Sequence, residues 1–506
     1  MTTHRTTPLL LALATATALT AAAAPAASAA PAAADGPRGS APRLDWRPCA
    51  KPGGPATQEC ADLPVPLDYA DPDGPRISVA VSRIRSERPG ARRGTLVVIP
   101  GGPGGSGVQR LTQKGAALGK QLDGAYDLVA LDPRGVGGST TAGCGLAPED
   151  RFLTTLRSWP GQDGDVTENL ARSQRFAEAC AANGGAVLRS FTTANQVRDM
   201  DRLRAALGER KLSAWGVSYG TYVGAVYAQT YPGRTDRWVL DSSGDPDPKR
   251  VARGWLANMG KGADDRFPDF AAWAAHPGRD AEGLRLAQSP EEVRPLVLSL
   301  AEALDRAPRP STTPGVPLTG SGLRQALQNA LYSDSAFPGL ARLLLTLRDP
   351  QAVPVLPPEL AQPLRDQDAS QTAAVICNDV AWPLLPAADQ QRAVDEDRAR
   401  HPLTGGMPVN VTPCSFWKTA PAAPPTRITD RGPSNILMVQ SRKDPATPYS
   451  ESLRMRAALG ERAVLVTVEQ GGHGVYLGNG NACGDAAVTR FLTTGTRPAR
   501  DTDCPN

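Results

Sequence analysis

The feature of this sequence that most constrains its fold is a short turn, Gly216-Val217-Ser218-Tyr219-Gly220. The residues before it, Lys211 to Trp215, are typical of a buried strand, and Tyr219 to Tyr231 are typical of a helix with small residues on its inner face. Glycines at both ends permit a strand-to-helix reversal so tight that side chains there would be crowded. Ser218 is therefore expected at the tip of a strained turn, as a nucleophile. Because the chain has 50 glycines, this pattern arises easily by chance and needs partner residues elsewhere.

The N-terminal segment predicts export from the cell. It has a short basic start at His4 and Arg5, an apolar run from Pro8 to about Ala24, and small residues at Ala27-Ser28-Ala29. This order is typical of a secretory signal peptide, residues 1–29. Residues 30–42, rich in Ala, Pro and Gly, predict a flexible lead-in. A retained membrane anchor is the alternative, but the apolar run is short and no later stretch is long enough to span a bilayer.

The charge balance argues against a nucleic-acid partner. The chain carries 55 Lys and Arg against 51 Asp and Glu, and no run of basic residues is long enough to follow a phosphate backbone. The sequence gives no indication of the oligomeric state.

The cysteine count agrees with export, because thiols outside the cytosol tend to be paired. There are eight cysteines, an even number, and eight allow about 105 connectivities. They fall into neighbouring couples along the chain, which predicts four local disulfides: Cys49 with Cys60, Cys144 with Cys180, Cys377 with Cys414, and Cys483 with Cys504. None lies in a pattern with metal-ligand spacing, so no metal site is expected.

The order of predicted elements indicates an α/β fold with a mostly parallel sheet. Continuous apolar runs that end in glycine-rich turns predict buried strands, and predicted helices lie between them. One such helix is predicted over Thr193 to Leu207, with Thr193 as its N-cap and Gly208 as its stop. The predicted strands are 76–84, 95–99, 126–131, 211–215, 237–240, 435–440 and 463–468, and a last helix is predicted near 485–492.

A long segment without strong strand signals divides the predicted sheet into two parts. Residues 246–425 contain helix-like stretches broken by prolines, such as 322–332 and 339–348. We expect a helical cap inserted between a first core part, 43–245, and a second core part, 426–506. Such a cap would cover the carboxyl edge of the strands, where open α/β sheets bind ligands.

The serine needs a base, and the choice of histidines is small. Of the four histidines, His4 lies in the signal peptide, and His276 and His401 each precede a proline in the helical block without a partner motif. His473 lies in a glycine-rich loop directly after the last predicted strand. Asp444 follows the strand before it, and the order Ser218, Asp444, His473 is that of an α/β-hydrolase. A solvated turn aspartate and a loop histidine without function are the alternatives.

Two backbone amides are expected to stabilise the oxyanion of an acyl-transfer reaction. One is that of Tyr219, immediately after the nucleophile, and the other is that of Gly102, in the glycine-rich loop after the strand 95–99. No Lys-Ser or Lys-Thr follows this loop, so it is not a phosphate-binding loop. The chemistry requires no cofactor.

Five motifs together resemble the secreted tripeptidyl aminopeptidases of actinomycetes, in the proline iminopeptidase branch of the α/β-hydrolases. The resemblance extends from Trp46 to Cys504 and includes the segment Ile376-Cys377-Asn378-Asp379. It implies an exopeptidase that releases short peptides, typically tripeptides, from free N-termini under a helical cap. The polar segment 241–246 departs from the apolar one expected there. The motifs are Pro100-Gly101-Gly102-Pro103-Gly104, Asp132-Pro133-Arg134-Gly135-Val136-Gly137-Gly138-Ser139, Gly216-Val217-Ser218-Tyr219-Gly220, Asp444-Pro445-Ala446-Thr447-Pro448 and Gly472-His473-Gly474.

An aminopeptidase must recognise a free amino group, which carboxylates at a fixed distance from the serine can do. Asp379 is our candidate, with a capping or turn residue beside a disulfide as the alternative. Two other functions remain open. An esterase or amidase acting on small acyl substrates would use the same scaffold, and a secreted binding protein on a hydrolase scaffold would not use the triad.

Overall fold

The computed structural model describes residues 43–49, 53–151, 153, 156–362 and 364–505. The predicted signal peptide and lead-in therefore lie outside the described residues. Within this part of the chain, no helix is long and apolar enough to cross a membrane. The same residues contain no group of three or more His, Cys, Asp or Glu side chains that could hold a metal ion.

A sheet of ten strands organises the described residues, in the order β1-β2-β3-β5-β4-β6-β7-β8-β9-β10. The first strands pair antiparallel, and from β5 onward every neighbouring pair is parallel. The strands are β1 (Arg47–Pro48), β2 (Gln58–Pro66), β3 (Arg76–Ile84), β4 (Gly94–Ile99), β5 (Tyr126–Leu131), β6 (Leu212–Val217), β7 (Thr235–Asp241), β8 (Ile436–Lys443), β9 (Ala463–Gly471) and β10 (Thr502–Cys504). The predicted strands coincide with seven of these, and β1, β2 and β10 were not predicted.

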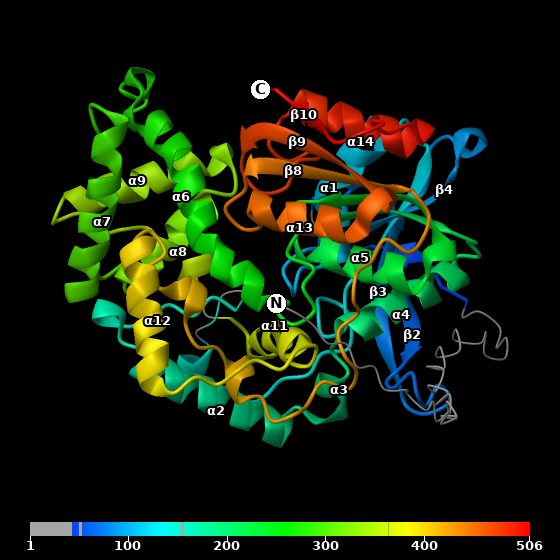
Figure 1. Ribbon diagram of the computed structural model, residues 1–506, viewed down its shortest axis with the longest axis horizontal. Helices are drawn as coiled ribbons and strands as arrows, with labels where there is room; N and C mark the ends of the chain where they lie inside the picture. The colour runs from blue at the N-terminus through cyan, green and yellow to red at the C-terminus, as the bar shows by residue number, and fades with distance from the viewer. Residues whose placement is uncertain (1–42, 50–52, 152, 154–155, 363, 506) are drawn as a thin grey trace, which may run out of the picture. The chain divides into compact units, whose positions relative to one another are not determined.

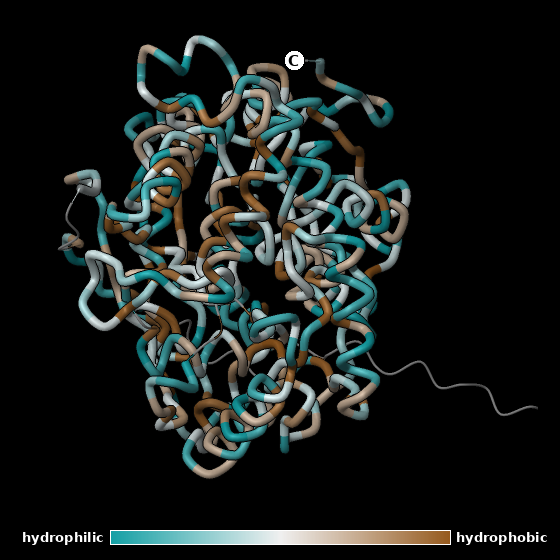
Figure 2. The backbone as a smooth tube through the Cα atoms, turned by 90° about the vertical axis from the view of Figure 1, so that its left-hand side faces the viewer, coloured by the Kyte–Doolittle hydropathy of each residue, from teal (hydrophilic) through white to brown (hydrophobic). Residues whose placement is uncertain are grey.

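Helices cover both faces of this sheet, and the alternation of side chains along the strands explains why. Val97 and Ile99 of β4 belong to one hydrophobic cluster with α4 (Thr193–Ala206), α5 (Tyr219–Thr230) and α13 (Tyr449–Leu459). Leu96 and Val98 belong to the cluster on the opposite face, with α1 (Gly107–Gln121) and α14 (Ala482–Thr494). Figure 1 shows the two groups of helices on the two sides of the strands. In Figure 2, the most hydrophobic segments run through the interior of the fold.

The described chain between β7 and β8 contains helices and one isolated bridge, Arg309 with Leu318, but no named strand. The C-terminal part of α6, together with α7, α8 and α9, has a hydrophobic cluster of its own. By contrast, α11 packs against the sheet, because six of its residues belong to the hydrophobic cluster that the sheet shares with α4, α5 and α13. The predicted cap is thus two packing units. The helices are α6 (Arg253–Ala275), α7 (Pro290–Arg306), α8 (Gly320–Ala330), α9 (Phe337–Arg348), α10 (Pro358–Ala361), α11 (Asp366–Cys377) and α12 (Ala387–Arg400).

Two further helices, α2 (Thr167–Asn183) and α3 (Gly185–Arg189), precede α4 and were not predicted. One expectation about α4 is wrong. Its N-cap is Thr192, whose hydroxyl accepts a hydrogen bond from the Asn195 amide, and Thr193 is the first helical residue. The Thr193 amide is thereby free to bind another acceptor.

The eight cysteines form four disulfides, with the neighbouring pairs that the sequence predicts. Each one fastens a short segment to a longer element. Cys504 in β10, for example, is joined to Cys483 in α14, which holds the C-terminal strand against β9. Four such crosslinks in the described chain agree with folding in an oxidising compartment.

Candidate active site

Ser218 lies at the turn between β6 and α5 with a backbone conformation that is rare for a residue with a side chain. Its φ is 59° and its ψ is −127°. The flanking glycines are required by close contacts, since a Cβ at Gly216 would lie 2.5 Å from the Gly220 carbonyl oxygen. A Cβ at Gly220 would lie 2.5 Å from the Ile99 carbonyl oxygen. The two neighbouring strands β4 and β6 and the first turn of α5 therefore hold the serine in this strained conformation.

Asp444 and His473 are in contact just after the ends of β8 and β9, respectively. His473 Nδ1 is 2.9 Å from each carboxylate oxygen of Asp444. Asp444 is only 1% exposed and accepts hydrogen bonds from the amides of Ala446 and Thr447 and from the Thr447 hydroxyl. These donors fix the carboxylate in one orientation. The ring of His473 is thereby turned with its Nε2 away from Asp444, as a general base requires.

Ser218 and His473 line the same cavity, although no hydrogen bond joins the Ser218 hydroxyl to the ring among the described contacts. Catalytic hydrogen bonds are often long in substrate-free structures and shorten when substrate binds. The structure therefore brings together the serine, the histidine and the aspartate that the sequence singles out.

The loop that carries His473 is held by a buried acid that sequence reasoning missed. Asp241, at the end of β7, accepts hydrogen bonds from the amides of Val475 and Tyr476 and from the indole of Trp215. Burial raises the pKa of Asp241, and these hydrogen bonds oppose that effect. The hydroxyl of the next residue, Ser242, accepts from the Gly474 amide. The polar segment 241–246 thus anchors the histidine loop, which explains its departure from an apolar pattern.

A second support for His473 comes from the inserted helices. Tyr332, just after α8, accepts a hydrogen bond from the His473 amide through its carbonyl oxygen. Its ring lies 4.9 Å from the imidazole, between centroids. The histidine is therefore held from the sheet side by Asp241 and from the helical side by Tyr332. No local sequence signal marks Tyr332, because its partner is far away in the chain.

The two amides predicted for an oxyanion hole are both without a partner in the described residues. Neither the Gly102 amide nor the Tyr219 amide donates a hydrogen bond to another described residue. Gly102 has a φ of 117°, which favours glycine, and lies with Ser218 on the wall of one cavity. Unpaired backbone donors beside a nucleophile can stabilise a developing oxyanion.

The cavity at Ser218 has a volume of about 660 Å³ and a strongly one-sided charge. Three cationic side chains line it, those of Arg110, Lys114 and Arg157. Among the described residues of this lining there is no aspartate or glutamate. Nothing in the sequence around Arg110, Lys114 or Arg157 indicates that these three cations line one cavity.

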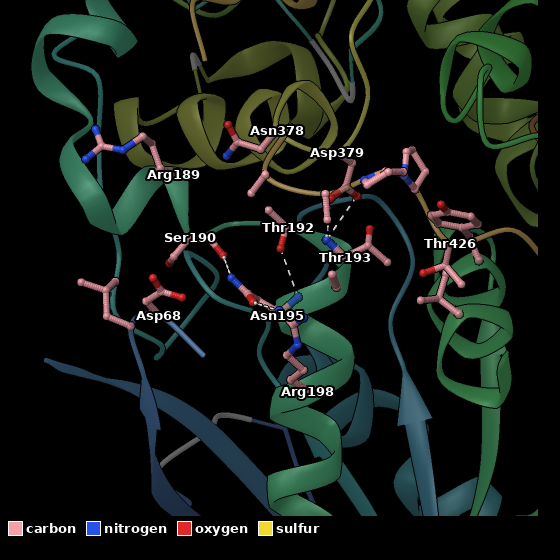
Figure 3. A pocket seen from close by; sticks show the side chains of 18 of the residues that line it. Asp68, Arg189, Ser190, Thr192, Thr193, Asn195, Arg198, Asn378, Asp379 and Thr426 are labelled. Atoms are coloured by element: carbon pink, nitrogen blue, oxygen red, sulfur yellow. Dashed lines mark hydrogen bonds between the residues drawn. The ribbon is translucent and has the colours of Figure 1, made fainter. Parts of the chain in front are cut away.

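Asp379 lines a different cavity, of about 370 Å³, so the structure does not bring it into the cavity at Ser218. Both of its oxygens accept from the Thr193 amide, at 3.0 and 3.1 Å. Figure 3 shows the carboxylate at the first turn of α4, with these two contacts dashed. Burial raises the pKa of Asp379 to about 7, and the hydrogen bonds from Thr193 oppose the shift.

A short chain of contacts links the two cavities. The Tyr219 hydroxyl is 2.7 Å from the Thr193 hydroxyl, and the Thr193 amide binds Asp379. Tyr219 directly follows the nucleophile. Asp379 is thus separated from Ser218 by the Tyr219 side chain and two hydrogen bonds.

One of the other histidines has an acidic partner that was not expected. His401 Nδ1 is 2.6 Å from the Asp264 carboxylate, in a contact between α6 and the end of α12. Neither residue is among those that line the cavity at Ser218. This pair therefore joins two of the inserted helices.

Comparison with known proteins relates the chain to a set of hydrolases. A family described as TAP-like protein matches residues 402–504, the span that contains Asp444 and His473. A tripeptidyl aminopeptidase of Streptomyces lividans is 34% identical over 487 residues, covering 91% of this chain and 86% of that protein. The serine protease Hip1 of Mycobacterium tuberculosis is 31% identical, covering 91% of each chain. A carboxylesterase B of Mycobacterium tuberculosis is 30% identical, covering 92% of this chain and 90% of that protein.

Proposed function

This chain belongs to the tripeptidyl aminopeptidase family of α/β-hydrolases, and we propose that it releases short peptides, chiefly tripeptides, from free N-termini. It is a serine hydrolase of the α/β-hydrolase fold. The observation that carries the proposal is the pairing of a serine in a strained turn with a histidine whose other nitrogen is bound by a buried aspartate.

The geometry supports an acyl-enzyme mechanism. His473 takes the proton of the Ser218 hydroxyl as the oxygen attacks the scissile carbonyl, and Asp444 stabilises the imidazolium that forms. The amides of Gly102 and Tyr219 bind the oxyanion. His473 then gives its proton to the leaving nitrogen, and a water molecule attacks the acyl-enzyme by the same path in reverse.

Asp379 is the carboxylate that we propose for the substrate amine. The described lining of the Ser218 cavity has no acidic side chain, so a carboxylate that recognises the amine has to lie outside it. Asp379 is buried, lines a cavity and forms no ion pair with a described cation. A tripeptide spans roughly 10 Å when extended, so a carboxylate that binds its amine has to lie at some distance from the Ser218 hydroxyl.

We further propose that the protein acts outside the cell. The N-terminal segment has the features of a secretory signal peptide, and four disulfides lie in the described chain. Disulfides form and persist in oxidising compartments.

The proposal is tested by comparing three substrates: a tripeptide anilide with a free amine, its N-acetylated form and a simple ester. An aminopeptidase should hydrolyse the free-amine anilide, and acetylation should lower kcat/KM sharply. Equal rates for the free and the acetylated anilide would contradict the proposal.

An esterase or amidase acting on small acyl compounds is the second candidate. The similarity to a protein named carboxylesterase B favours it, because that relative covers nearly the whole chain. Faster turnover of the simple ester, with no effect of a free amine, would support this function instead.

A further inference from the structure

The three cations that line the Ser218 cavity are not explained by the hydrolytic mechanism, which uses none of them. A buried cation is costly unless a charge or several hydrogen bonds compensate it. The partners of each cation therefore indicate whether it serves the fold or faces a ligand.

The side chain of Arg110, in the first turn of α1, makes no hydrogen bond or ion pair with a described residue. Its guanidinium lies over the ring of Trp215, 4.9 Å from the centroid. Its Nε is buried without a partner. Burial lowers the pKa of Arg110, and the charge of Asp241 opposes this effect. The oxygens of Asp241 accept hydrogen bonds from Val475, Tyr476 and Trp215, and no hydrogen bond or ion pair joins them to the Arg110 side chain among the described contacts.

Arg157 is 3% exposed and has no acidic partner among the described residues. Its guanidinium donates to the Asn329 side-chain oxygen at 2.9 Å and to the Tyr332 hydroxyl. Its Nε is buried and unpartnered. Two neutral acceptors orient this cation toward the cavity without neutralising its charge.

The remaining cation, Lys114, has one neutral partner. Its ammonium group donates to the Leu477 carbonyl oxygen at 2.9 Å. Lys114 therefore adds positive charge at the edge where the histidine loop meets α1, and no described carboxylate of the lining offsets it.

These cations lie on the histidine side of the nucleophile. The same cavity is lined by residues that follow His473, namely Gly474, Tyr476, Leu477 and Gly478. Tyr332, whose ring contacts His473, accepts a hydrogen bond from Arg157 through its hydroxyl. Because the histidine gives its proton to the leaving nitrogen, the leaving group must depart on this side.

We propose that Arg110 and Arg157 form a carboxylate-binding subsite for the leaving group of the substrate. This inference rests on the proposed peptidase function and adds a substrate class to it. The enzyme would favour short peptides whose negative charge lies just beyond the scissile bond. That charge is the C-terminal carboxylate when one residue follows the bond, or an acidic side chain in a longer peptide.

The test compares the hydrolysis of matched peptides by the full-length protein. Ala-Ala-Ala-Ala is used as the free acid and as the C-terminal amide, and a second pair, Ala-Ala-Ala-Asp-amide and Ala-Ala-Ala-Asn-amide, moves the charge to a side chain. Initial rates of tripeptide release are measured by liquid chromatography with mass spectrometry. We expect kcat/KM for the charged member of at least one pair to be higher by about tenfold or more.

The pair that shows the preference identifies the source of the carboxylate. A preference in the first pair alone indicates a C-terminal carboxylate, and a preference in the second pair indicates an acidic side chain. Wild-type ratios near one in both pairs would overturn the inference.

Two variants connect the preference to Arg110. Arg110→Gln should reduce the charged-to-neutral ratio toward one, and Arg110→Lys should restore part of it. Lys120→Gln is the matched control, because Lys120 is an exposed cation of the same helix and lies outside the lining of the cavity. This control should keep the wild-type ratio. A ratio unchanged in Arg110→Gln would overturn the inference.

Failure of this inference can be distinguished from failure of the proposed function. If the wild-type protein hydrolyses the free-amine tripeptide anilide, which has no carboxylate, but shows no charge preference, only the subsite is wrong. If it hydrolyses neither the anilide nor the peptides, both proposals are wrong. Thermal unfolding of each variant shows whether it is folded.

Discussion

Two cavities of this protein differ in the charge of their walls. The one at Ser218 is lined by Arg110, Lys114 and Arg157 and, among its described residues, by no acid. The one at Asp379 is lined by Asp68 and Asp379 together with Arg189 and Arg198. A short peptide is positive at its amine and negative at its carboxylate, so the difference would orient it with its N-terminus toward Asp379 and its C-terminus toward Arg110.

The strand-turn-helix unit of β6 and α5 contributes residues to the walls of both cavities. Ser218 lines one cavity, and Tyr222, one turn further along α5, lines the other. Between them, the Tyr219 side chain reaches the Thr193 hydroxyl while its amide stays free on the Ser218 side. If Asp379 binds the amine as we propose, this single strand-turn-helix unit sets the distance between that amine and the bond that is cut.

Removing the nucleophile gives the largest expected effect and separates binding from turnover. Ser218→Ala should lower kcat on a tripeptide anilide about 10⁴-fold or more. Folding should be little affected, because the hydroxyl makes no hydrogen bond with a described residue. Both cavities should then bind an uncleaved peptide, which isothermal titration calorimetry measures. Ser213→Ala, a hydroxyl deletion in the same strand, is the control, and activity of Ser218→Ala near that of the wild type would contradict the assignment.

The sequence predicts the central strands because each is a short apolar run closed by a glycine-rich turn, as in β5 and β6. It does not predict β2, where Pro64 and Pro66 interrupt the pattern, or β10, which has three residues and depends on pairing with β9. Local patterns also miss α1, whose three glycines weaken its helical signal.

In the active site, sequence order identifies residues that follow strands, such as Asp444 and His473, since the carboxyl ends of parallel strands meet at one edge. It cannot identify Asp241 as the anchor of the histidine loop, because the amides that it binds are those of Val475 and Tyr476, far along the chain. Likewise, the charge of the Ser218 cavity arises only when α1 and the segment before α2 meet.

A second buried acid, Glu451 in α13, serves as a control that distinguishes the effect of burial on a carboxyl pKa from the recognition of an amine. Like Asp379 it is buried, but it lines neither cavity. Burial raises its pKa to about 8, with smaller effects of Asp245 and Asp444 in the same direction. Because the folded pKa lies above the unfolded one, its contribution to stability is complete at low pH and is lost as pH rises toward 8.

Glu451→Gln should remove this pH dependence. The free energy of unfolding of the variant relative to that of the wild type should increase by roughly 4 kcal/mol between pH 4.5 and pH 8. Chemical denaturation at several pH values measures it. The KM for free-amine substrates should stay the same, since Glu451 faces no cavity of the substrate path. A stability difference that is independent of pH would contradict the assigned cause.

The smallest expected effect tests the cavity at Asp379. Asp379→Asn should raise the KM of a free-amine tripeptide anilide about tenfold, because a charge-assisted hydrogen bond is lost, and should leave the N-acetylated substrate unaffected. Asp68→Asn is the matched control, as Asp68 lines the same cavity but is exposed. An unchanged KM in Asp379→Asn would exclude this residue as the amine ligand.

The proposed role of Asp379 also predicts the direction in which KM changes with pH. The pKa of Asp379 is raised to about 7, so below that pH the carboxyl is increasingly protonated and attracts an ammonium group less strongly. The substrate amine itself loses its proton above about pH 8. The KM of the wild type should therefore be lowest between these two values, and in Asp379→Asn the rise on the acid side should disappear. If the acid-side rise persists in the variant, the amine is bound by a different group and the two cavities do not form one substrate path.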